Sequence, residues 1–319
     1  MIALMMIKCP MPKNSYDSYK DLPSARLLSD RCRLPVEQLV SEHYHQEWRV
    51  ETFDDMNDFA SHPSAILSDG TRPVFVKLNE AAHGLHQFEA EMAGLRLLTD
   101  RAGILTPTPV GIASFEGGVI LVLEAVQAVE RTPHEWREIG RTLARIHLNR
   151  GDRFGLELQG YWGPLYQDNR PTADWLSFYT ERRLWPRLIG AIDSGNLSTD
   201  IIRQVEKLVS RLPGLDIPPM EPVLLHGDAQ QNNFISTAAG AVAVDPSVYY
   251  GHPEMDLAYV DFFQAVPEDI FAGYREILPI DPGLGERRDL WRLPAYLALV
   301  DVGGSDYLDL LTQALKKYI

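Results

Sequence analysis

The feature that most constrains the fold of this chain is a change of pattern near residue 125. Between residues 47 and 125, an Asp-Gly turn at 69–70 and a Glu-Gly-Gly turn at 116–118 each lie between two short apolar runs. Apolar runs joined by such turns predict antiparallel hairpins. From residue 132 onward, apolar residues recur mainly at helical spacing. We therefore expect an α+β fold in which a small antiparallel sheet lobe precedes a larger, mostly helical lobe.

The length of 319 residues is consistent with two lobes. We expect an N-terminal extension over residues 1–46, a small lobe over 47–125 and a large lobe over 126–319. Thr132 and Glu135 predict a capping box at the start of the first large-lobe helix. Further helices are expected near 172–193 (interrupted at Pro186), 198–211, 252–265, 288–300 and 305–318.

Composition excludes several classes of protein. The chain carries 30 Lys and Arg against 44 Asp and Glu, a net charge of −14, which disfavours non-specific binding to nucleic acid or anionic membranes. The apolar run at 119–123 is far shorter than the ~20 residues of a membrane span. Two cysteines, Cys9 and Cys32, cannot form a disulfide framework, and the first residues lack a signal-peptide pattern. We therefore expect a cytoplasmic protein.

A group of polar residues follows a predicted strand in the large lobe. The apolar residues 223–225 lead into His226-Gly227-Asp228, Asn233 follows five residues after the aspartate, and a second apolar strand delivers Asp245. A carboxylate such as Asp228 can accept the proton of an attacking hydroxyl. The amide oxygen of Asn233 and the carboxylate of Asp245 can hold Mg²⁺ across the phosphates of a nucleotide. This spacing is that of the phosphoryl-transfer template of kinases.

The small lobe offers the other groups that this template needs. Lys77 ends an apolar strand, and its ammonium could reach the α- and β-phosphates of ATP. A carboxylate from the following helix must hold this lysine; Glu91 is the first choice and Glu89 the alternative. After the second hairpin, the backbone of Glu124 and Val126 could hydrogen-bond to adenine.

Each of these features also has a simpler explanation when taken alone. A His-Gly-Asp turn can be merely strained, a strand lysine is usually solvated, and an Asp before Pro often accepts local hydrogen bonds. The order of the features along both lobes has no such explanation. We therefore predict a bilobal protein-kinase-like fold that uses ATP and Mg²⁺.

The chain also resembles a known family. Residues 245–258, DPSVYYGHPEMDLA, are similar to the D-P-A-x-Y-Y-G-x-x-E-x-D-L-A motif of the fructosamine kinase (ketosamine-3-kinase) family. That family lies within the aminoglycoside phosphotransferase and protein-kinase-like superfamily. The likeness runs from about residue 72 to 316. Further segments that resemble the family are 75–79, 88–92, 167–184 and 303–307.

This resemblance implies an ATP-dependent kinase that phosphorylates a sugar hydroxyl of a ketosamine. The acceptor would be a fructosamine or ribulosamine, as a small molecule or bound to a protein. By position, Asp228 would be the catalytic base, His226 would support its loop, and Asp256 would accept hydrogen bonds that brace it. The remaining residues keep the roles given above.

Departures from the family pattern concern the phosphates and the acceptor. Residues 53–62 stand where the family has a glycine pair, yet they contain three aspartates and no glycine, and carboxylates there would repel phosphate. Either this loop swings outward, or ATP binding is weakened as in a pseudokinase. Gln230 stands where the family has a tryptophan. The stretch 297–300 is apolar where the family is rich in Asn and His.

The acceptor site is less constrained by the sequence than the phosphate site. Gln230 could hydrogen-bond to a polyol or an amine, and Asp168, Asn169 and Arg182 could face the same acceptor. The alternative acceptor is an aminoglycoside or a choline-like alcohol, for which an acidic lining is expected. The sequence gives no indication of the oligomeric state.

Overall fold

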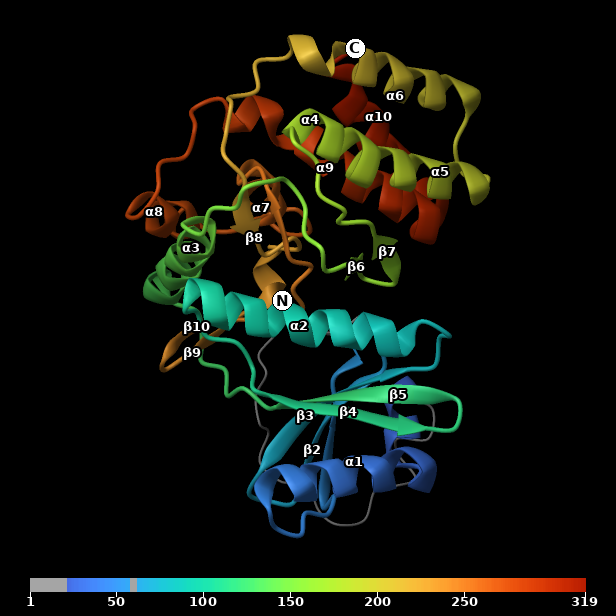
Figure 1. Ribbon diagram of the computed structural model, residues 1–319, viewed down its shortest axis with the longest axis vertical. Coiled ribbons are helices and arrows are strands. Elements are labelled where there is room, and N and C mark those ends of the chain that lie inside the picture. Colours follow the sequence, from blue (N-terminus) through green and yellow to red (C-terminus); the bar gives the residue numbers. More distant parts are fainter. Residues whose placement is uncertain (1–21, 58–61) are drawn as a thin grey trace.

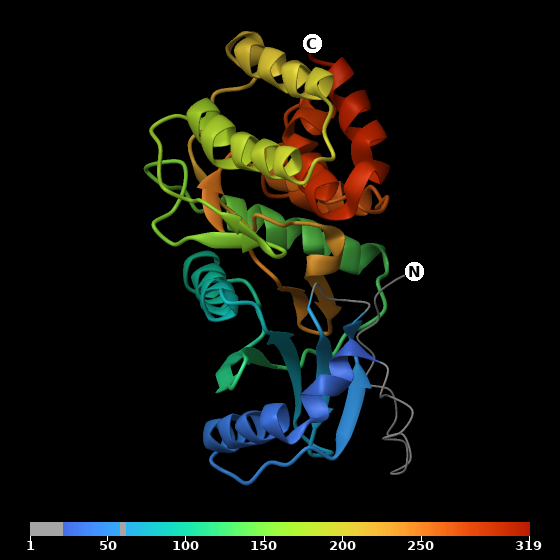
Figure 2. The same cartoon turned by 90° about the vertical axis from the view of Figure 1, so that its right-hand side faces the viewer.

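The hairpins expected before residue 125 form one five-stranded antiparallel sheet with the order β1-β2-β3-β5-β4. The computed structural model describes residues 22–57 and 62–319, and the sheet forms a small lobe beside a larger helical one (Figures 1 and 2). The strands are β1 (Thr52–Asp55), β2 (Ser64–Ser68), β3 (Pro73–Asn79), β4 (Pro109–Phe115) and β5 (Gly118–Glu124).

The alternating side chains of this sheet pack against two helices. Val74, Val76 and Leu78 lie in one buried cluster with residues of α1 (Asp30–Tyr44). Phe75 lies in a second cluster, with residues of α2 (Gly84–Ala102). The two helices lie on opposite faces of the sheet, and α2 lies on the side of the large lobe (Figure 1). Because both faces are covered, residues 74–76 and 78 of β3 form a nearly continuous apolar run rather than an alternating one.

Part of the expected N-terminal extension packs into this small lobe. Within the described residues, 22–46 contain η2 (Pro23–Leu28) and α1, whose Leu27, Val36 and Val40 are fully buried. The buried Glu37 of α1 accepts a hydrogen bond from the Val50 N–H (3.0 Å), and this inward carboxylate weakens the apolar periodicity. Residues 1–21 lie outside the described residues. We propose that the small lobe begins near residue 22 rather than 47.

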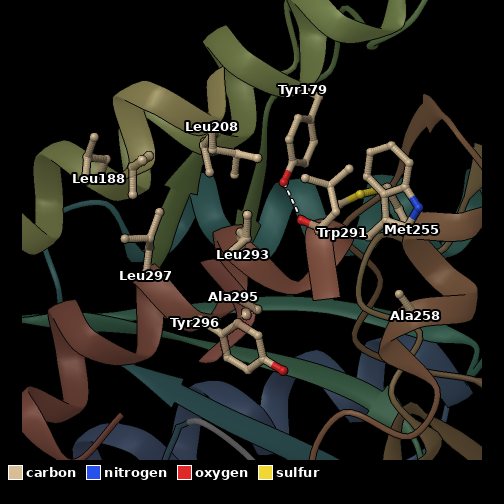
Figure 3. Packing of buried hydrophobic residues seen from close by; sticks show 14 of the residues in the cluster. Tyr179, Leu188, Leu208, Met255, Ala258, Trp291, Leu293, Ala295, Tyr296 and Leu297 are labelled. Carbon is tan, nitrogen blue, oxygen red and sulfur yellow. Dashed lines mark hydrogen bonds between the residues drawn. The ribbon is translucent and has the colours of Figure 1, made fainter. Parts of the chain in front are cut away.

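The large lobe is assembled around α9, whose buried face includes Trp291, Leu293 and Leu297 (Figure 3). The hydroxyl of Tyr179 donates to the Leu290 carbonyl (2.5 Å) inside this core. The apolar stretch 297–300 is therefore largely core, which accounts for its composition. The large-lobe helices are α3 (Pro133–His147), α4 (Trp175–Phe178), α5 (Trp185–Asp193), α6 (Thr199–Arg211), α7 (Glu254–Tyr259), α8 (Asp269–Arg275), α9 (Leu284–Gly303) and α10 (Leu308–Lys316).

Short elements complete the large lobe. Its strands form three two-stranded sheets: β6 (Gly160–Trp162) with β7 (Leu165–Gln167), β8 (Val223–Leu225) with β11 (Tyr249–Gly251), and β9 (Phe234–Thr237) with β10 (Gly240–Ala243). The single turns are the π-helical η4 (Tyr179–Leu184) and the 3₁₀ turns η5 (Leu212–Gly214), η6 (Gln231–Asn233) and η7 (Gly304–Tyr307). None of the helices in the described ranges could span a membrane.

Several expected helices differ in extent from the prediction. The capping box at Thr132 and Glu135 is present. The helix expected from Thr172 begins at Trp175, because the Asp174 side chain caps it by accepting from the Ser177 N–H (2.8 Å). The helix expected over 252–265 is limited to α7, and the β6–β7 hairpin was not predicted because its strands have three residues each.

Candidate active site

A cavity of about 620 Å³ has a lining contributed by both lobes and the segment that joins them. It contains the predicted phosphate, metal and base residues together with the proposed adenine-binding segment. The predicted residues on its wall are Lys77, Glu91, Glu124, Val126, Asp228, Gln230, Asn233 and Asp245.

The loop that carries Asp228 is fixed from behind by a buried carboxylate. It leaves β8 at His226, and Asp256 of α7 accepts the backbone N–H groups of His226 (2.7 Å) and Gly227 (2.9 Å). His147 lies 3.1 Å from the same carboxylate. Gly227 has φ +81°, and a Cβ there would lie 1.9 Å from the Ser247 carbonyl oxygen. The turn therefore requires glycine, which gives the Gly of the His-Gly-Asp motif a geometric reason.

His226 lies behind the cavity rather than on its wall. Its Nε2 is 3.0 Å from the Val244 carbonyl oxygen, and its own carbonyl accepts the Ser247 N–H (2.8 Å). Burial lowers the pKa of this imidazole. These contacts tie the loop of Asp228 to the strand end that carries Asp245, which agrees with a supporting role.

Two donors hold the Asp228 carboxylate. The Asn233 amide donates to Oδ2 (2.9 Å), and the indole N–H of Trp162 donates to Oδ1 (3.0 Å). Burial raises the pKa of Asp228 to about 7, although both donors act in the opposite direction. A carboxylate with a pKa near neutrality can take up a proton during turnover more readily than an ordinary aspartate.

A buried ion-pair cluster joins the two lobes. The Lys77 ammonium, only 3% exposed, lies 2.8 Å from Glu91 Oε1 and also contacts Asp245. Burial alone lowers the pKa of Lys77, but the two carboxylates raise it above its ordinary value. Glu91 is therefore the partner of Lys77, whereas Glu89 is exposed. Asp245 has φ +53°, a conformation that non-glycine residues adopt mainly where surrounding contacts impose it.

The oxygen atoms at this point fit a hard divalent cation. The Asn233 amide nitrogen donates to the Asp228 backbone oxygen (2.8 Å) as well as to its carboxylate. This leaves Oδ1 as the amide atom that those contacts do not use. Asp245 adds a carboxylate, and carboxylate and amide oxygens with nucleotide phosphates are the ligands that Mg²⁺ prefers.

The segment between the lobes is held by backbone contacts. The Glu124 N–H donates to the Thr108 carbonyl (2.9 Å), and the Glu124 side chain lies 3.1 Å from His43 of α1. The adenine contacts expected here therefore fall to the Glu124 carbonyl and the Val126 N–H, which remain a proposal. Arg131 follows, and its guanidinium donates to the Gln231 side chain (2.7 Å) and backbone (3.0 Å). Sequence reasoning missed this arginine because no motif marks it.

Three of the four expected acceptor residues do not reach the cavity. Asn169 is fully buried, donates to the Leu158 carbonyl (2.9 Å) and accepts from Arg183 (2.6 Å). Asp168 pairs with Arg170 (2.7 Å) and lies 3.6 Å from Arg182. These residues brace the segment behind the β6–β7 hairpin, and only Gln230 lines the cavity.

The described aspartates of the acidic loop lie away from the cavity, whereas His62 of the same loop lines it. Asp55 accepts hydrogen bonds from the Ser24 hydroxyl (2.5 Å) and the Asn57 amide (2.7 Å). Neither Asp54 nor Asp55 lines the cavity. The third aspartate, Asp58, lies outside the described residues.

Comparison with protein families gives a match to the fructosamine kinases over residues 34–319. The chain belongs to the fructosamine kinase family. It is 31% identical to a probable ketoamine kinase of Synechocystis sp. over 285 residues, which are 88% of this chain and 95% of the relative. It is 32% identical to a chloroplastic protein-ribulosamine 3-kinase of rice, Oryza sativa, over 73% of this chain and 68% of that protein.

A solved structure agrees with this assignment. A candidate fructosamine-3-kinase of Thermobifida fusca superposes with a TM-score of 0.78 at 30% identity, covering 89% of this chain and 98% of the other. The bilobal kinase-like fold expected from the sequence is thus confirmed.

Proposed function

We propose that this fructosamine kinase family member transfers the γ-phosphoryl group of ATP to a sugar hydroxyl of a ketosamine, with Mg²⁺ as cofactor. The proposal rests on the observation that residues of both lobes line one cavity. The small lobe contributes the Lys77–Glu91 pair, and the large lobe contributes Asp228, Asn233 and Asp245. The names of the relatives supply the ketosamine class of acceptor.

The chemistry follows from the charges of these residues. Lys77 would hold the α- and β-phosphates, and Asn233 with Asp245 would hold Mg²⁺, which offsets the phosphate charge when bound. The acceptor hydroxyl would attack the γ-phosphorus in line, and its proton would pass to Asp228 as ADP leaves. Asn233 orients that carboxylate through the 2.9 Å hydrogen bond.

The lining of the cavity favours a ketosamine over a polycationic aminoglycoside. In the described part of the chain, the carboxylates on its wall are Glu91, Glu124, Asp228 and Asp245. Glu91 and Asp245 contact Lys77, and Glu124 lies beside His43. Two of the four carboxylates on the described wall are therefore already paired with a cation, which makes this wall a weaker site for several ammonium groups. The remaining wall includes the apolar Leu165, Phe263 and Val302.

The geometry also favours an active enzyme over a pseudokinase. Asp55 is hydrogen-bonded to Ser24 and Asn57 rather than directed at the phosphates. The ion-pair partners of Lys77 are present. The free, buried Cys32 suits a reducing compartment, so we place the enzyme in the cytoplasm, and its net charge of −14 argues against a nucleic-acid partner.

Release of ADP from Mg·ATP tests this proposal, with and without fructosyl-lysine or ribulosyl-lysine. We expect ADP release and a phosphorylated acceptor with at least one of them, and loss of both in Asp228→Asn. A thermal-shift series with ATP, with and without Mg²⁺, reports nucleotide binding separately. Full activity of Asp228→Asn would reject the catalytic base. Binding of Mg·ATP without transfer to either acceptor would reject the ketosamine class, and no nucleotide binding would favour the pseudokinase.

A further inference from the structure

Trp162 lies at the point of the cavity where the acceptor must approach. It ends strand β6, and the short β6–β7 hairpin that carries it is fixed to both lobes. The Ser247 hydroxyl of the large lobe donates to the Tyr161 carbonyl (2.6 Å), and the Gln87 amide of α2 donates to the Gly163 carbonyl (3.0 Å). The hairpin therefore holds its tryptophan in a defined place.

The indole contacts the carboxylate that is proposed to act as base. Trp162 Nε1 lies 3.0 Å from Asp228 Oδ1, and Oδ2 accepts from Asn233. Each oxygen thus already accepts one hydrogen bond, and an acceptor hydroxyl that gives its proton to this carboxylate must approach beside one of the two donors. Asn233 is the less replaceable donor, because it also donates to the Asp228 backbone oxygen (2.8 Å).

The indole at this carboxylate comes from a segment that the sequence did not associate with it. Position 230, two residues after Asp228, is Gln, and within the described residues Trp162 is the tryptophan that lines the cavity. A ring with a single N–H donor suits this place, since it can orient one carboxylate oxygen while its apolar face excludes water.

We propose that Trp162 is a positioning residue that holds Asp228 Oδ1 and shields it from water until an acceptor hydroxyl binds beside the indole. This rests on the proposed kinase function. Without the indole N–H, a water molecule can take its place on Oδ1 and give its proton to this oxygen. Water oxygen then attacks the γ-phosphorus, the bond to the β-phosphate oxygen breaks, and ADP and phosphate leave without acceptor. Trp162 thus favours phosphoryl transfer to the acceptor over hydrolysis of ATP.

The substitution Trp162→Phe tests this role because it keeps an aromatic ring and removes the N–H donor. Trp185→Phe is the matched control, since Trp185 packs against the large-lobe core and does not line the cavity. We expect the ratio of acceptor-independent ATP hydrolysis to ketosamine phosphorylation to rise about tenfold in Trp162→Phe, the effect of losing one hydrogen bond to a charged group. The KM for Mg·ATP and the control should stay within about twofold of wild type. An unchanged ratio in Trp162→Phe would overturn the proposal.

A spectroscopic measurement decides the same point independently of turnover. In protein with ¹⁵N-labelled tryptophan, the indole resonance absent from Trp162→Phe belongs to Trp162. We expect this resonance to move in Asp228→Asn, which weakens the acceptor, and to move on addition of a phosphorylatable ketosamine. A resonance indifferent to Asp228→Asn would overturn the proposal. If wild type phosphorylates no ketosamine, the proposed function fails, whereas the hydrolysis rates and the effect of Asp228→Asn still decide the role of Trp162.

Discussion

The two ends of the cavity differ in how firmly their residues are held. At the catalytic end, Lys77, Asp228 and Asn233 all have hydrogen-bond or ion-pair partners within 3.0 Å. On the part of the wall that we assign to the acceptor, Phe263 and Val302 are 52% and 57% exposed although both line the cavity. The fold therefore fixes the site of phosphoryl transfer and leaves the acceptor side open to change by surface substitutions.

Electrostatics explains this difference. Buried charges are tolerated only with compensating partners, so removing one partner leaves another uncompensated. Half-exposed apolar side chains have no such dependence, and their replacement disturbs little beyond the contact with a ligand. Substitutions at the two ends should therefore differ in which property they change, namely stability and turnover at the catalytic end and the KM for the acceptor at the other. The size of the effect should differ as well.

The largest effect is expected at the metal-binding end, with Asp245→Asn. The variant keeps the size of the side chain but removes the charge that faces Lys77 and the proposed Mg²⁺. We expect turnover to fall roughly 10³-fold, because metal and positioning groups supply most of the catalysis in phosphoryl transfer. ADP release measured across a Mg²⁺ titration checks this. Turnover within tenfold of wild type at equal Mg²⁺ would argue against Asp245 as a ligand.

The brace behind the catalytic loop should show the next largest effect. Asp256→Ala leaves the N–H groups of His226 and Gly227 without their acceptor. We expect a loss of about 2–4 kcal/mol in the free energy of unfolding, because several buried donors lose their partner. Asp269→Ala is the control, since its ion pair with Arg137 is partly exposed and is worth about 1 kcal/mol or less. Equal losses in urea unfolding would break the contrast between buried and exposed acids.

The contrast between paired buried charges and half-exposed apolar side chains also explains which features the sequence could predict. The spacing of Asp228, Asn233 and Asp245 predicts one site because buried charges tolerate few alternatives, and the structure brings the three residues to one cavity. The turns at 69–70 and 116–118 between apolar runs likewise predict the hairpins of the sheet. Asn169 looked like an acceptor residue, but it is a buried polar side chain satisfied by backbone carbonyls.

The missed features lacked a local signal for physical reasons. Helix α1 places Glu37 inward, where Arg33 of the same helix and partners from outside it compensate the charge, so its pattern is not simply amphipathic. The contact between Trp162 and Asp228 joins positions 66 residues apart, across a hairpin too short for periodicity to reveal. Such long-range pairings depend on how the lobes and loops pack, which a single sequence does not encode in any short motif.

A third prediction concerns pH and Asp228. Burial raises the pKa of this carboxyl to about 7 in the folded protein, against about 3.9 when unfolded. The folded state thus binds the proton more tightly, and stability is lost as the pH rises from the unfolded to the folded pKa. Asp228→Asn, which cannot ionise, should be more stable than wild type by about 1–2 kcal/mol at pH 8 and nearly equal at pH 4.

Urea unfolding without nucleotide or Mg²⁺ at the two pH values measures this difference. The gain in the free energy of unfolding should stay below the value that corresponds to the full pKa shift, because the new amide presents a donor to Asn233. Asp269→Asn, at a partly exposed position outside the cavity, serves as the control. If Asp228→Asn were less stable than wild type at pH 8, the raised pKa of Asp228 would be contradicted.

The smallest effect is expected at the acceptor rim, with Phe263→Ser. Because Phe263 is half exposed, its loss should change the melting temperature little. The KM for a ketosamine formed on an aromatic amine should rise about three- to fivefold, because the apolar contact with that substrate is lost. The KM for fructosyl-lysine should rise less, and kcat should be unchanged. Leu148→Ser is the control, since Leu148 is 54% exposed and does not line the cavity. A fall in kcat or melting temperature in Phe263→Ser as large as that in Asp256→Ala would show that the rim is coupled to the catalytic end. The distinction between a fixed transfer site and an adaptable acceptor side would then fail.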